Sequence, residues 1–302
     1  MRFLVTGASG FIGSALIDKW ITDDSCDEII ALSRTPEKLE SRFNGRVRVI
    51  HSLGQINDQD KIDAVINLAG EPILDKRWSE DRKEKLYDSR INTTDELLKC
   101  CRRLVSPPGT LISGSAIGYY GNQKDDRELD EKQEGHPCFA HRLCHDWENK
   151  AQQAESMGMR VCLLRTGVVL GRGGVLQRML PLFRCGLGGP IGSGKQWMSW
   201  IDLQDMVNGI DFLLRHETLS GPFNLTAPEP VNNLQFSTTL AQTLRRPAFI
   251  RVPAFMLELM LGEGSELLTE GQRVVPEKLQ RAGFEFIYPS LKQSLEHVLK
   301  AV

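Results

Sequence analysis

The sequence lacks an excess of charge of either sign. Its 302 residues carry 37 Lys and Arg against 39 Asp and Glu, which gives a formal net charge of −2. A strongly basic surface attracts nucleic acids and anionic membranes, so we expect neither partner. Long apolar runs are missing too, because the run 161–170 is interrupted by Arg165, whereas a bilayer span needs about 20 apolar residues. We therefore expect no membrane-spanning helix, and no signal or transit peptide before the strand-like run 2–6.

Paired cysteines are absent as well. The seven cysteines are an odd number without any C-x-x-C spacing, and only Cys100 and Cys101 are neighbours. Disulfide frameworks and zinc sites use cysteines in regularly spaced pairs. The sequence thus predicts no metal site, and it predicts a soluble protein of a reducing compartment, either the cytoplasm or an organelle matrix.

The sequence does contain an alternation of strand-like and helix-like segments. Apolar runs of the buried-strand type recur, at residues 3–5, 28–32, 46–50, 64–68, 110–113 and 160–164. Helical spacing of apolar residues is clearest at 11–20 and 86–104. Such alternation predicts βαβ units and an α/β fold with a doubly wound parallel sheet of the Rossmann type. We place this core at residues 1–168.

Beyond residue 168 the pattern changes. Gly-rich loops appear at 171–174 and 186–194, and the rest of the chain favours helices. The expected elements are a helix at 202–214 and a strand at 222–225 that return to the core, then helices at 234–244 and 254–261. We assign residues 169–302 to this mixed segment and to a small helix-rich C-terminal domain on the substrate side.

The first strand leads into the segment Thr6-Gly-Ala-Ser-Gly-Phe-Ile-Gly13, which opens a helix. Gly7 permits a tight turn, Gly10 lets the backbone approach a pyrophosphate, and Gly13 lets the helix pack closely on the sheet. The helix N-terminus adds free N–H groups and a partial positive charge. This context, more than the glycines alone, predicts a dinucleotide-binding loop, with a purely structural turn as the alternative.

Two residues at the end of the second strand indicate which dinucleotide binds. NAD sites usually place an Asp or Glu about 20 residues beyond the loop, where it holds the ribose 2′-hydroxyl. This sequence has Ser33 and Arg34 there. An acid would repel a 2′-phosphate, whereas Arg pairs with it and Ser donates a hydrogen bond. The sequence therefore predicts NADP(H), unless Arg34 is only an exposed loop residue.

Several motifs resemble those of the extended short-chain dehydrogenase/reductase family. They are Asn67-Leu-Ala-Gly-Glu71, the stretch from Leu111 to Gly121 that contains Ser115, and Trp200-Ile-Asp-Leu-Gln-Asp-Met-Val207. Within that family, the atypical branch of "epimerase family proteins" is the most similar. The motifs of this chain that resemble the branch are Arg77-Trp-Ser-Glu-Asp-Arg82, Asp88-Ser-Arg90, the 186–194 loop and Gly271-Gln-Arg273. The resemblance extends over nearly the whole chain.

The resemblance implies which residues contact the dinucleotide. They are Gly7, Ser9, Gly10, Phe11, Ile12, Gly13, Ser33, Arg34, Ser52, Leu53, Leu68, Ala69, Gly70, Glu71 and Arg82. For Arg82 an alternative stays open, because it lies in a mixed run of Lys, Arg and Glu that is typical of a solvated helix face.

The catalytic residues of the family are only partly present. Standard members use a Ser, and a Tyr and a Lys spaced as Tyr-x-x-x-Lys. Ser115 takes the Ser position, but aligning Glu148 with the acid that follows the motif puts Ala140 at the Tyr position and Cys144 at the Lys position. Ala has no proton to donate, and an uncharged thiol supplies no fixed positive charge.

Four other side chains are candidates to replace the missing pair. Tyr119 and Tyr120 follow Ser115 closely, and we interpret them either as catalytic or substrate-site residues or as packing residues with a bonded hydroxyl. His141 and His145 have a suitable pKa for proton transfer, with exposed helix residues as the alternative.

Two functions remain open at this point. The first is an NADP(H)-dependent oxidoreductase or epimerase acting on an unknown small molecule, favoured by Ser115 and by the 186–194 loop, which suits a substrate cover. The second is a catalytically silent NADP(H)-binding regulatory or interaction protein with a protein partner, favoured by the missing Tyr-x-x-x-Lys pair.

Overall fold

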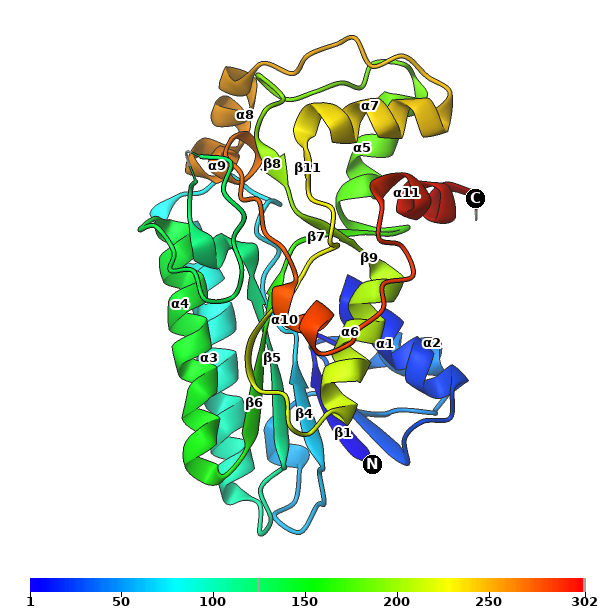
Figure 1. Cartoon of the computed structure of the whole chain (residues 1–302). Coiled ribbons are helices and arrows are strands. Elements are labelled where there is room, and N and C mark those ends of the chain that lie inside the picture. Colours follow the sequence, from blue (N-terminus) through cyan, green and yellow to red (C-terminus); the bar gives the residue numbers. More distant parts are fainter. Residues whose placement is uncertain (124, 301–302) are drawn as a thin grey trace.

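A seven-stranded parallel sheet forms the centre of the computed structural model, which describes residues 1–123 and 125–300 (Figure 1). In spatial order its strands are β10 (Gly221–Leu225), β6 (Arg160–Thr166), β5 (Thr110–Ala116), β4 (Ala64–Asn67), β1 (Arg2–Thr6), β2 (Glu28–Leu32) and β3 (Arg48–Ile50). From β1 the chain builds outwards to β3, then crosses to β4 on the other side of β1. Open α/β sheets bind ligands at such a reversal, outside the carboxyl ends of the strands. The expected Rossmann-type fold is confirmed.

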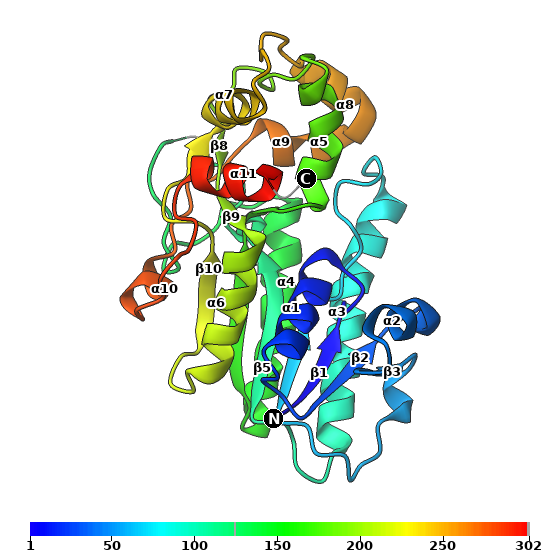
Figure 2. The same cartoon turned by 90° about the vertical axis from the view of Figure 1, so that its right-hand side faces the viewer.

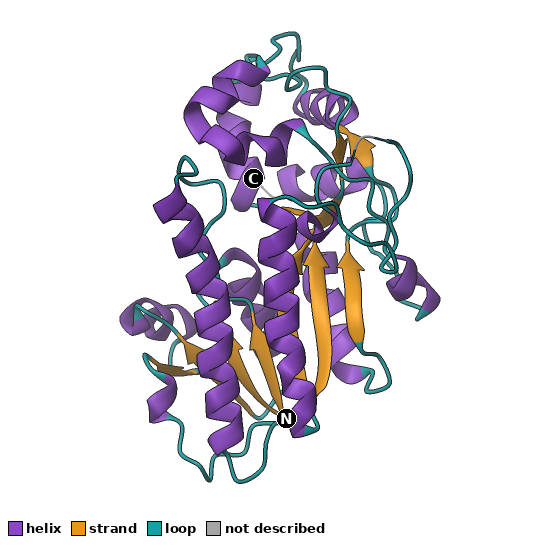
Figure 3. Cartoon of the chain, turned by 90° about the vertical axis from the view of Figure 1, so that its left-hand side faces the viewer, coloured by secondary structure: helices purple, strands orange, loops and turns teal. Residues whose placement is uncertain are grey.

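Helices cover both faces of the sheet. On one face α1 (Phe11–Thr22) packs beside α6 (Leu203–Arg215), with α2 (Pro36–Phe43) next to β3. On the other face α3 (Glu80–Arg103) and α4 (Phe139–Gln152) lie side by side along the strands (Figure 3). Each face has its own cluster of buried apolar side chains, so the sheet is covered on both sides, as the continuous apolar strands require.

Beyond the carboxyl edge of the sheet lies a second, mostly helical layer (Figure 2). Its helices are α5 (Gly174–Arg184), α7 (Asn233–Leu244), α8 (Ala254–Leu261), α9 (Glu266–Thr269) and α11 (Leu291–Lys300), and its strand pairs are β7 (Val168–Leu170) with β9 (Trp200–Asp202) and β8 (Trp197–Met198) with β11 (Val231–Asn232). Buried side chains such as Leu176, Phe236 and Leu295 join α5, α7 and α11. The short α10 (Glu277–Arg281) packs on β10. Two other elements of the second half of the chain, α6 and β10, also belong to the core and not to the helical layer.

The expected elements differ from the observed ones at two informative places. Helix α3 begins at Glu80, well before residue 86, because the Ser79 hydroxyl caps it by accepting from the Arg82 N–H at 3.2 Å. Its first turns are highly charged, so apolar periodicity does not reveal them. Helix α6 runs one residue later than expected, from Leu203 to Arg215, because Asp202 is its N-cap and accepts from the Gln204 N–H at 2.8 Å, while residues 200–202 form the strand β9.

Three further properties of the described residues bear on the class of protein. In residues 1–123 and 125–300, no helix combines the length and apolar character that crossing a bilayer requires. The same residues contain no group of His, Cys, Asp and Glu side chains arranged to hold a metal ion. All seven cysteines are free thiols.

A buried carboxylate ties the C-terminal segment to the core. Asp205 on α6 accepts from the backbone N–H groups of Ile287 and Tyr288 at 2.8 and 2.9 Å. Burial raises the pKa of Asp205, although these two N–H donors act in the opposite direction. Asp205, the second aspartate of the Trp200 motif, therefore holds the segment of chain that leads into α11.

We expect Asp205→Ala to lower the free energy of unfolding by about 1–3 kcal/mol, because it leaves two backbone donors without their acceptor. Chemical denaturation measures the change. Gln204→Ala is the matched control, since Gln204 is exposed on the same helix turn. Equal losses in both variants would show that the contact with residues 287 and 288 does not stabilise the fold.

Candidate functional site

The turn after β1 brings backbone segments together at the reversal point of the sheet. Gly7 has a left-handed backbone with a φ of +70°, and a Cβ there would lie 2.6 Å from the carbonyl group of Leu68. At Gly13 a Cβ would lie 2.3 Å from the Gly7 oxygen. Gly10 is the N-cap of α1 and is exposed, and no side-chain hydrogen bond caps the first turn of this helix within the described residues. We call this region outside the carboxyl ends of β1 and β4 the crevice, and it presents a helix N-terminus with its partial positive charge to an anion.

The other predicted loop residues surround the same turn. Ser9 is exposed, while Phe11 and Ile12 are half-buried at the start of α1. The Gly-rich turn after β7 packs on the Phe11 ring, and a Cβ on Gly173 would lie 3.0 Å from that ring. On the other side of the crevice, the Ala69 N–H donates to the Thr6 hydroxyl at 3.2 Å.

Arginines gather beside this crevice around one carboxylate. Arg34, whose side chain is 89% exposed, contacts Glu71 with 3.0 Å between Nη1 and Oε1. Arg82, which is largely buried, contacts the other oxygen of Glu71 at 3.3 Å. The Arg34 hydrogen bond and then that of Arg82 hold the pKa of Glu71 below its usual range. Nearby, Arg90 donates to the Glu71 carbonyl at 3.1 Å, and a Cβ on Gly70 would lie 3.1 Å from the Arg90 guanidinium.

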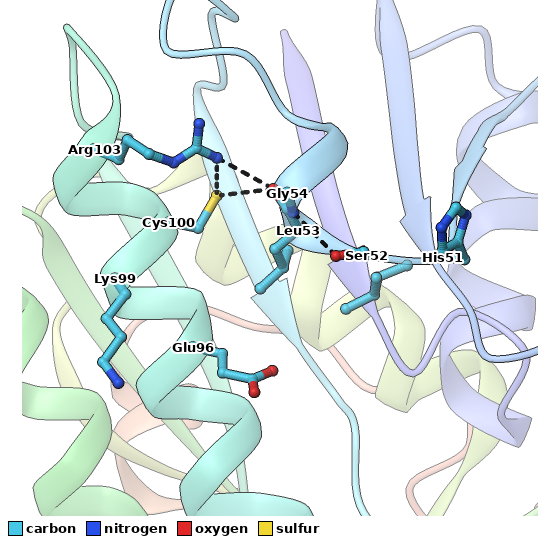
Figure 4. A pocket seen from close by; sticks show the side chains of 9 residues that line it. His51, Ser52, Leu53, Gly54, Glu96, Lys99, Cys100 and Arg103 are labelled. Carbon is cyan, nitrogen blue, oxygen red and sulfur yellow. Dashed lines mark hydrogen bonds between the residues drawn. The ribbon is translucent and has the colours of Figure 1, made fainter.

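The end of β2 and the end of β3 lie together at the same edge. Ser33 is buried, its N–H donates to the Ile50 carbonyl at 2.9 Å, and its hydroxyl accepts from the Thr35 N–H at 3.1 Å. Ser52 and Leu53 follow β3 and line a pocket of about 450 Å³ against the second half of α3 (Figure 4).

Hydrogen bonds fix the position of one wall of the pocket shown in Figure 4. The Arg103 guanidinium donates to the Leu53 carbonyl at 3.2 Å and to the Ile56 carbonyl at 2.8 Å. Ser52 caps the short 3-10 turn that follows it, accepting from the Gly54 N–H at 3.2 Å. Leu32, the last residue of β2, contributes an apolar surface to the same pocket. The sequence-predicted residues at 33–34 and 52–53 therefore lie at neighbouring strand ends.

A buried network lies behind the carboxyl ends of β5 and β6. Both Glu148 oxygens accept from the Arg165 guanidinium at 2.9 Å, and the Ser115 hydroxyl donates to Glu148 at 2.6 Å. Arg165 also donates to the Tyr120 hydroxyl at 3.2 Å, which in turn donates to Asn224 on β10 at 2.7 Å. The network thus occupies the hydroxyl groups of both Ser115 and Tyr120, and burial raises the pKa of Tyr120.

Between the sheet edge and the second layer lies a cavity of about 280 Å³. Ala140 and Cys144, one turn apart on α4, both face it, together with the end of β5. Burial raises the pKa of the Cys144 thiol to about 12, so the thiol is uncharged at neutral pH. The α4 wall of the cavity therefore offers neither a proton donor of useful acidity nor a cation.

The remaining catalytic candidates lie elsewhere. His141 and His145 line a separate hollow on the outer side of α4, with Pro137 and Arg142. The His141 ring contacts the Tyr119 carbonyl, and the Tyr119 ring lies against Arg165, with the guanidinium carbon 3.4 Å from the ring centre. Ser115 and the two tyrosines are thus brought to one network, which His141 touches through Tyr119, and neither His141 nor His145 lines the cavity.

Sequence reasoning missed the role of Arg165 and most of the cavity wall. An arginine within the apolar strand 160–166 was a usable signal, because a buried charge needs a partner. No comparable signal marks cavity residues such as Val175, Met179 and Leu268, which are ordinary apolar residues of short helices.

The sheet, the crevice and the separate helical layer define a Rossmann-type protein with a second layer over the carboxyl edge of its sheet. Residues 3–226 match the NAD dependent epimerase/dehydratase family, and the chain belongs to that family. Residues 252–298, which include α8, α9 and α11 of the helical layer and α10 beside β10, match a domain of unknown function, DUF1731.

Several relatives match nearly the whole chain. An epimerase family protein of Mycobacterium leprae is 40% identical over 97% of this chain and 94% of its own length. The chloroplastic homolog of epimerase family protein SDR39U1 from Arabidopsis thaliana is 36% identical, over 99% and 87%. The predicted resemblance to this branch is confirmed.

Solved structures show the same fold. The human epimerase family protein SDR39U1, crystallised with NADPH, superposes with a TM-score of 0.88 at 31% identity, and all of both chains is covered. A UDP-glucuronic acid 4-epimerase from Bacillus cereus, in complex with UDP-glucuronic acid and NAD, has a TM-score of 0.78 at 18% identity, over 99% of this chain and 98% of its own. The latter likeness shows the fold alone.

We expect Glu148→Ala to lower the free energy of unfolding by about 3–5 kcal/mol, because it leaves the Arg165 guanidinium buried without a counter-charge. Chemical denaturation measures the change, with the exposed Glu155→Ala as the control. A double variant, Glu148→Leu with Arg165→Met, should be more stable than Glu148→Ala, because it removes both charges. A double variant less stable than Glu148→Ala would contradict this account of the pair.

Proposed function

We propose that this protein binds NADP(H) in the crevice and acts as an oxidoreductase or epimerase on a small molecule in the adjoining cavity. The observation that carries the proposal is the position of Ser33 and Arg34 at the end of β2, the strand next to β1, where Arg34 shares the Glu71 carboxylate with Arg82. The human relative crystallised with NADPH supports it, since that protein matches the whole chain.

The residues at the crevice fit this cofactor. The N–H groups at the start of α1 suit a pyrophosphate, and Ser33 with Arg34 suits a 2′-phosphate. The pocket beside Ser52 and Leu53 suits the adenosine. The Arg82 Nε is buried and has no hydrogen-bond partner within the described residues, so a donor remains available there. When bound, NADPH supplies a hydride equivalent, and the chain's own residues bind and orient it.

Glu71 has a distinct part in this arrangement. Its carboxylate pairs with both Arg34 and Arg82, which leaves a net charge of +1 on the three groups, and it holds the exposed Arg34 side chain beside Arg82. Since Arg34 is exposed, the pair adds little to stability. A phosphate group that enters competes with Glu71 for Arg34, and Arg binds a phosphate through paired hydrogen bonds.

NADPH should bind more tightly than NADH, and Arg34→Ala should weaken NADPH binding by about 1.5–3 kcal/mol, the size of a charge-assisted contact. Calorimetric titration measures both affinities. Arg42→Ala is the control, because it removes another exposed arginine, in the last turn of α2, that pairs with Asp18 instead of Glu71. Equal affinities of the wild type for NADH and NADPH would refute the assignment of Ser33 and Arg34.

Gly10→Val should abolish NADPH binding and keep the fold, because a Cβ there meets only the Gly7 oxygen, at 3.0 Å. The side chain would fill the space of the pyrophosphate. Gly13→Val should instead disrupt folding, since its Cβ would overlap the Gly7 backbone. Thermal unfolding with and without NADPH separates the two effects. A folded Gly10→Val protein that NADPH still stabilises would contradict the loop assignment.

A second candidate function is a catalytically silent NADP(H)-binding regulatory or interaction protein. The observation that favours it is the α4 wall, where Ala140 and Cys144 face the cavity and the hydroxyls of Ser115 and Tyr120 are engaged elsewhere. A missing general acid costs about 10²–10⁴-fold in rate.

The two candidates differ in NADPH oxidation against a panel of carbonyl compounds and nucleotide sugars, and in NADP⁺-dependent epimerisation of those sugars, which consumes no net cofactor and is read from the products. A silent protein leaves NADPH unoxidised throughout, and the double variant Ala140→Tyr with Cys144→Lys then gains activity. Wild-type turnover on any member of the panel favours the enzyme. Turnover that survives Ser115→Ala would show that Ser115 is not a catalytic residue.

A further inference from the structure

The cavity between the sheet edge and the helical layer differs chemically from the crevice beside it. We propose that it receives a neutral, largely apolar small molecule, and not a sugar nucleotide. This inference rests on the proposed function, because it names the class of substrate that would meet the nicotinamide.

Apolar side chains form most of the cavity wall. They come from segments far apart in the sequence, with Ile117 after β5, Val168 on β7, Met179 on α5, Met198 on β8, and Leu267 and Leu268 on α9. Ligand sites owe their orientation and specificity to a few well-placed polar groups among such walls. The identity and availability of the polar groups therefore decide what the cavity can bind.

The polar groups of the wall are mostly used by the protein itself. The Ser199 hydroxyl donates to the Gln272 carbonyl at 2.7 Å and accepts from the Val274 N–H at 2.8 Å. The Asn233 oxygen accepts from the Ile191 N–H at 2.7 Å. The Gln272 amide group donates to the Gly121 carbonyl at 2.8 Å. A sugar with several hydroxyl groups would lose its hydrogen bonds to water and meet a wall on which these donors and acceptors already bond to the protein.

Positive charge is missing from the wall as well. Among its residues in the described part of the chain, Glu270 carries the one formal charge, and it is negative and exposed. The nearby Arg273 lies on the Trp197 ring and pairs with Glu128 at 3.0 Å, while Arg178 pairs with Asp75. A diphosphate would thus enter without a counter-charge, and buried charges without a partner are strongly disfavoured.

A graded binding experiment tests this class of ligand. The probes are a homologous series of straight-chain methyl ketones, with UDP-glucose as the sugar nucleotide, titrated calorimetrically into the protein with saturating NADP⁺. The oxidised cofactor prevents reduction of the ketone during the measurement. Each added methylene should tighten ketone binding about fourfold until the cavity is filled, because burying a methylene contributes about 0.8 kcal/mol. UDP-glucose should show no saturable binding.

Variants locate the binding in the cavity. Val175→Phe fills the cavity from α5 and should weaken ketone binding by at least about tenfold, the effect of overpacking a closed site. Gln177→Phe adds the same ring to the exposed side of α5 and should leave binding unchanged. Leu268→Phe repeats the test from α9 and serves if Val175→Phe fails to fold.

Each outcome decides the proposal. NADP⁺ is titrated first, without any ketone. If it does not bind, the proposed cofactor is refuted. The ketones are then titrated into the protein without NADP⁺. Tighter binding of UDP-glucose than of the ketones overturns the inference while leaving NADP(H) binding intact. Absence of saturable ketone binding also overturns it, as does ketone binding that Val175→Phe and Gln177→Phe affect equally.

Discussion

The buried contact between Arg165 and Glu148 is the interaction on which the site depends. It joins the end of β6 to α4, and through Ser115 and Tyr120 it reaches β5 and β10. Such a pair adds little net stability compared with apolar packing, but neither partner can be removed alone. Its effect is geometric, because it fixes the face of α4 that borders the cavity.

That geometry separates two environments within one ligand-binding region. The crevice over β1 and β2 contains a helix N-terminus and arginines, which suit phosphate groups. The cavity beyond β5 and β6 is apolar, and its α4 wall carries Ala140 and Cys144. The polar groups that chemistry would need are drawn into the network behind the wall. The same contact that orders the site therefore withdraws Ser115 and Tyr120 from direct work on a ligand.

The sequence predicts the strands of the core and the helices at 234–244 and 254–261, but not how the helices of the second layer meet around the cavity, and the reasons are physical. Buried parallel strands such as 28–32 are continuous apolar runs, and the glycines of the first turn stand where side chains would collide. The neighbouring positions of residues 33–34 and 52–53 follow from strand order. By contrast, the cavity arises from contacts between short helices, and no local pattern encodes which of their side chains meet. The engagement of the Ser115 hydroxyl by Glu148 is likewise a property of the folded chain, although both residues are visible in the sequence.

The central claim is that one NADPH molecule extends from the phosphate-binding turn to the apolar cavity. A crystal structure of the protein with NADPH tests it most directly. The account predicts the pyrophosphate at the N-terminus of α1, the 2′-phosphate against Ser33 and Arg34, and the nicotinamide at the mouth of the cavity beside Ala140 and Cys144. A nicotinamide directed away from α4, or a 2′-phosphate that contacts only solvent, would contradict it.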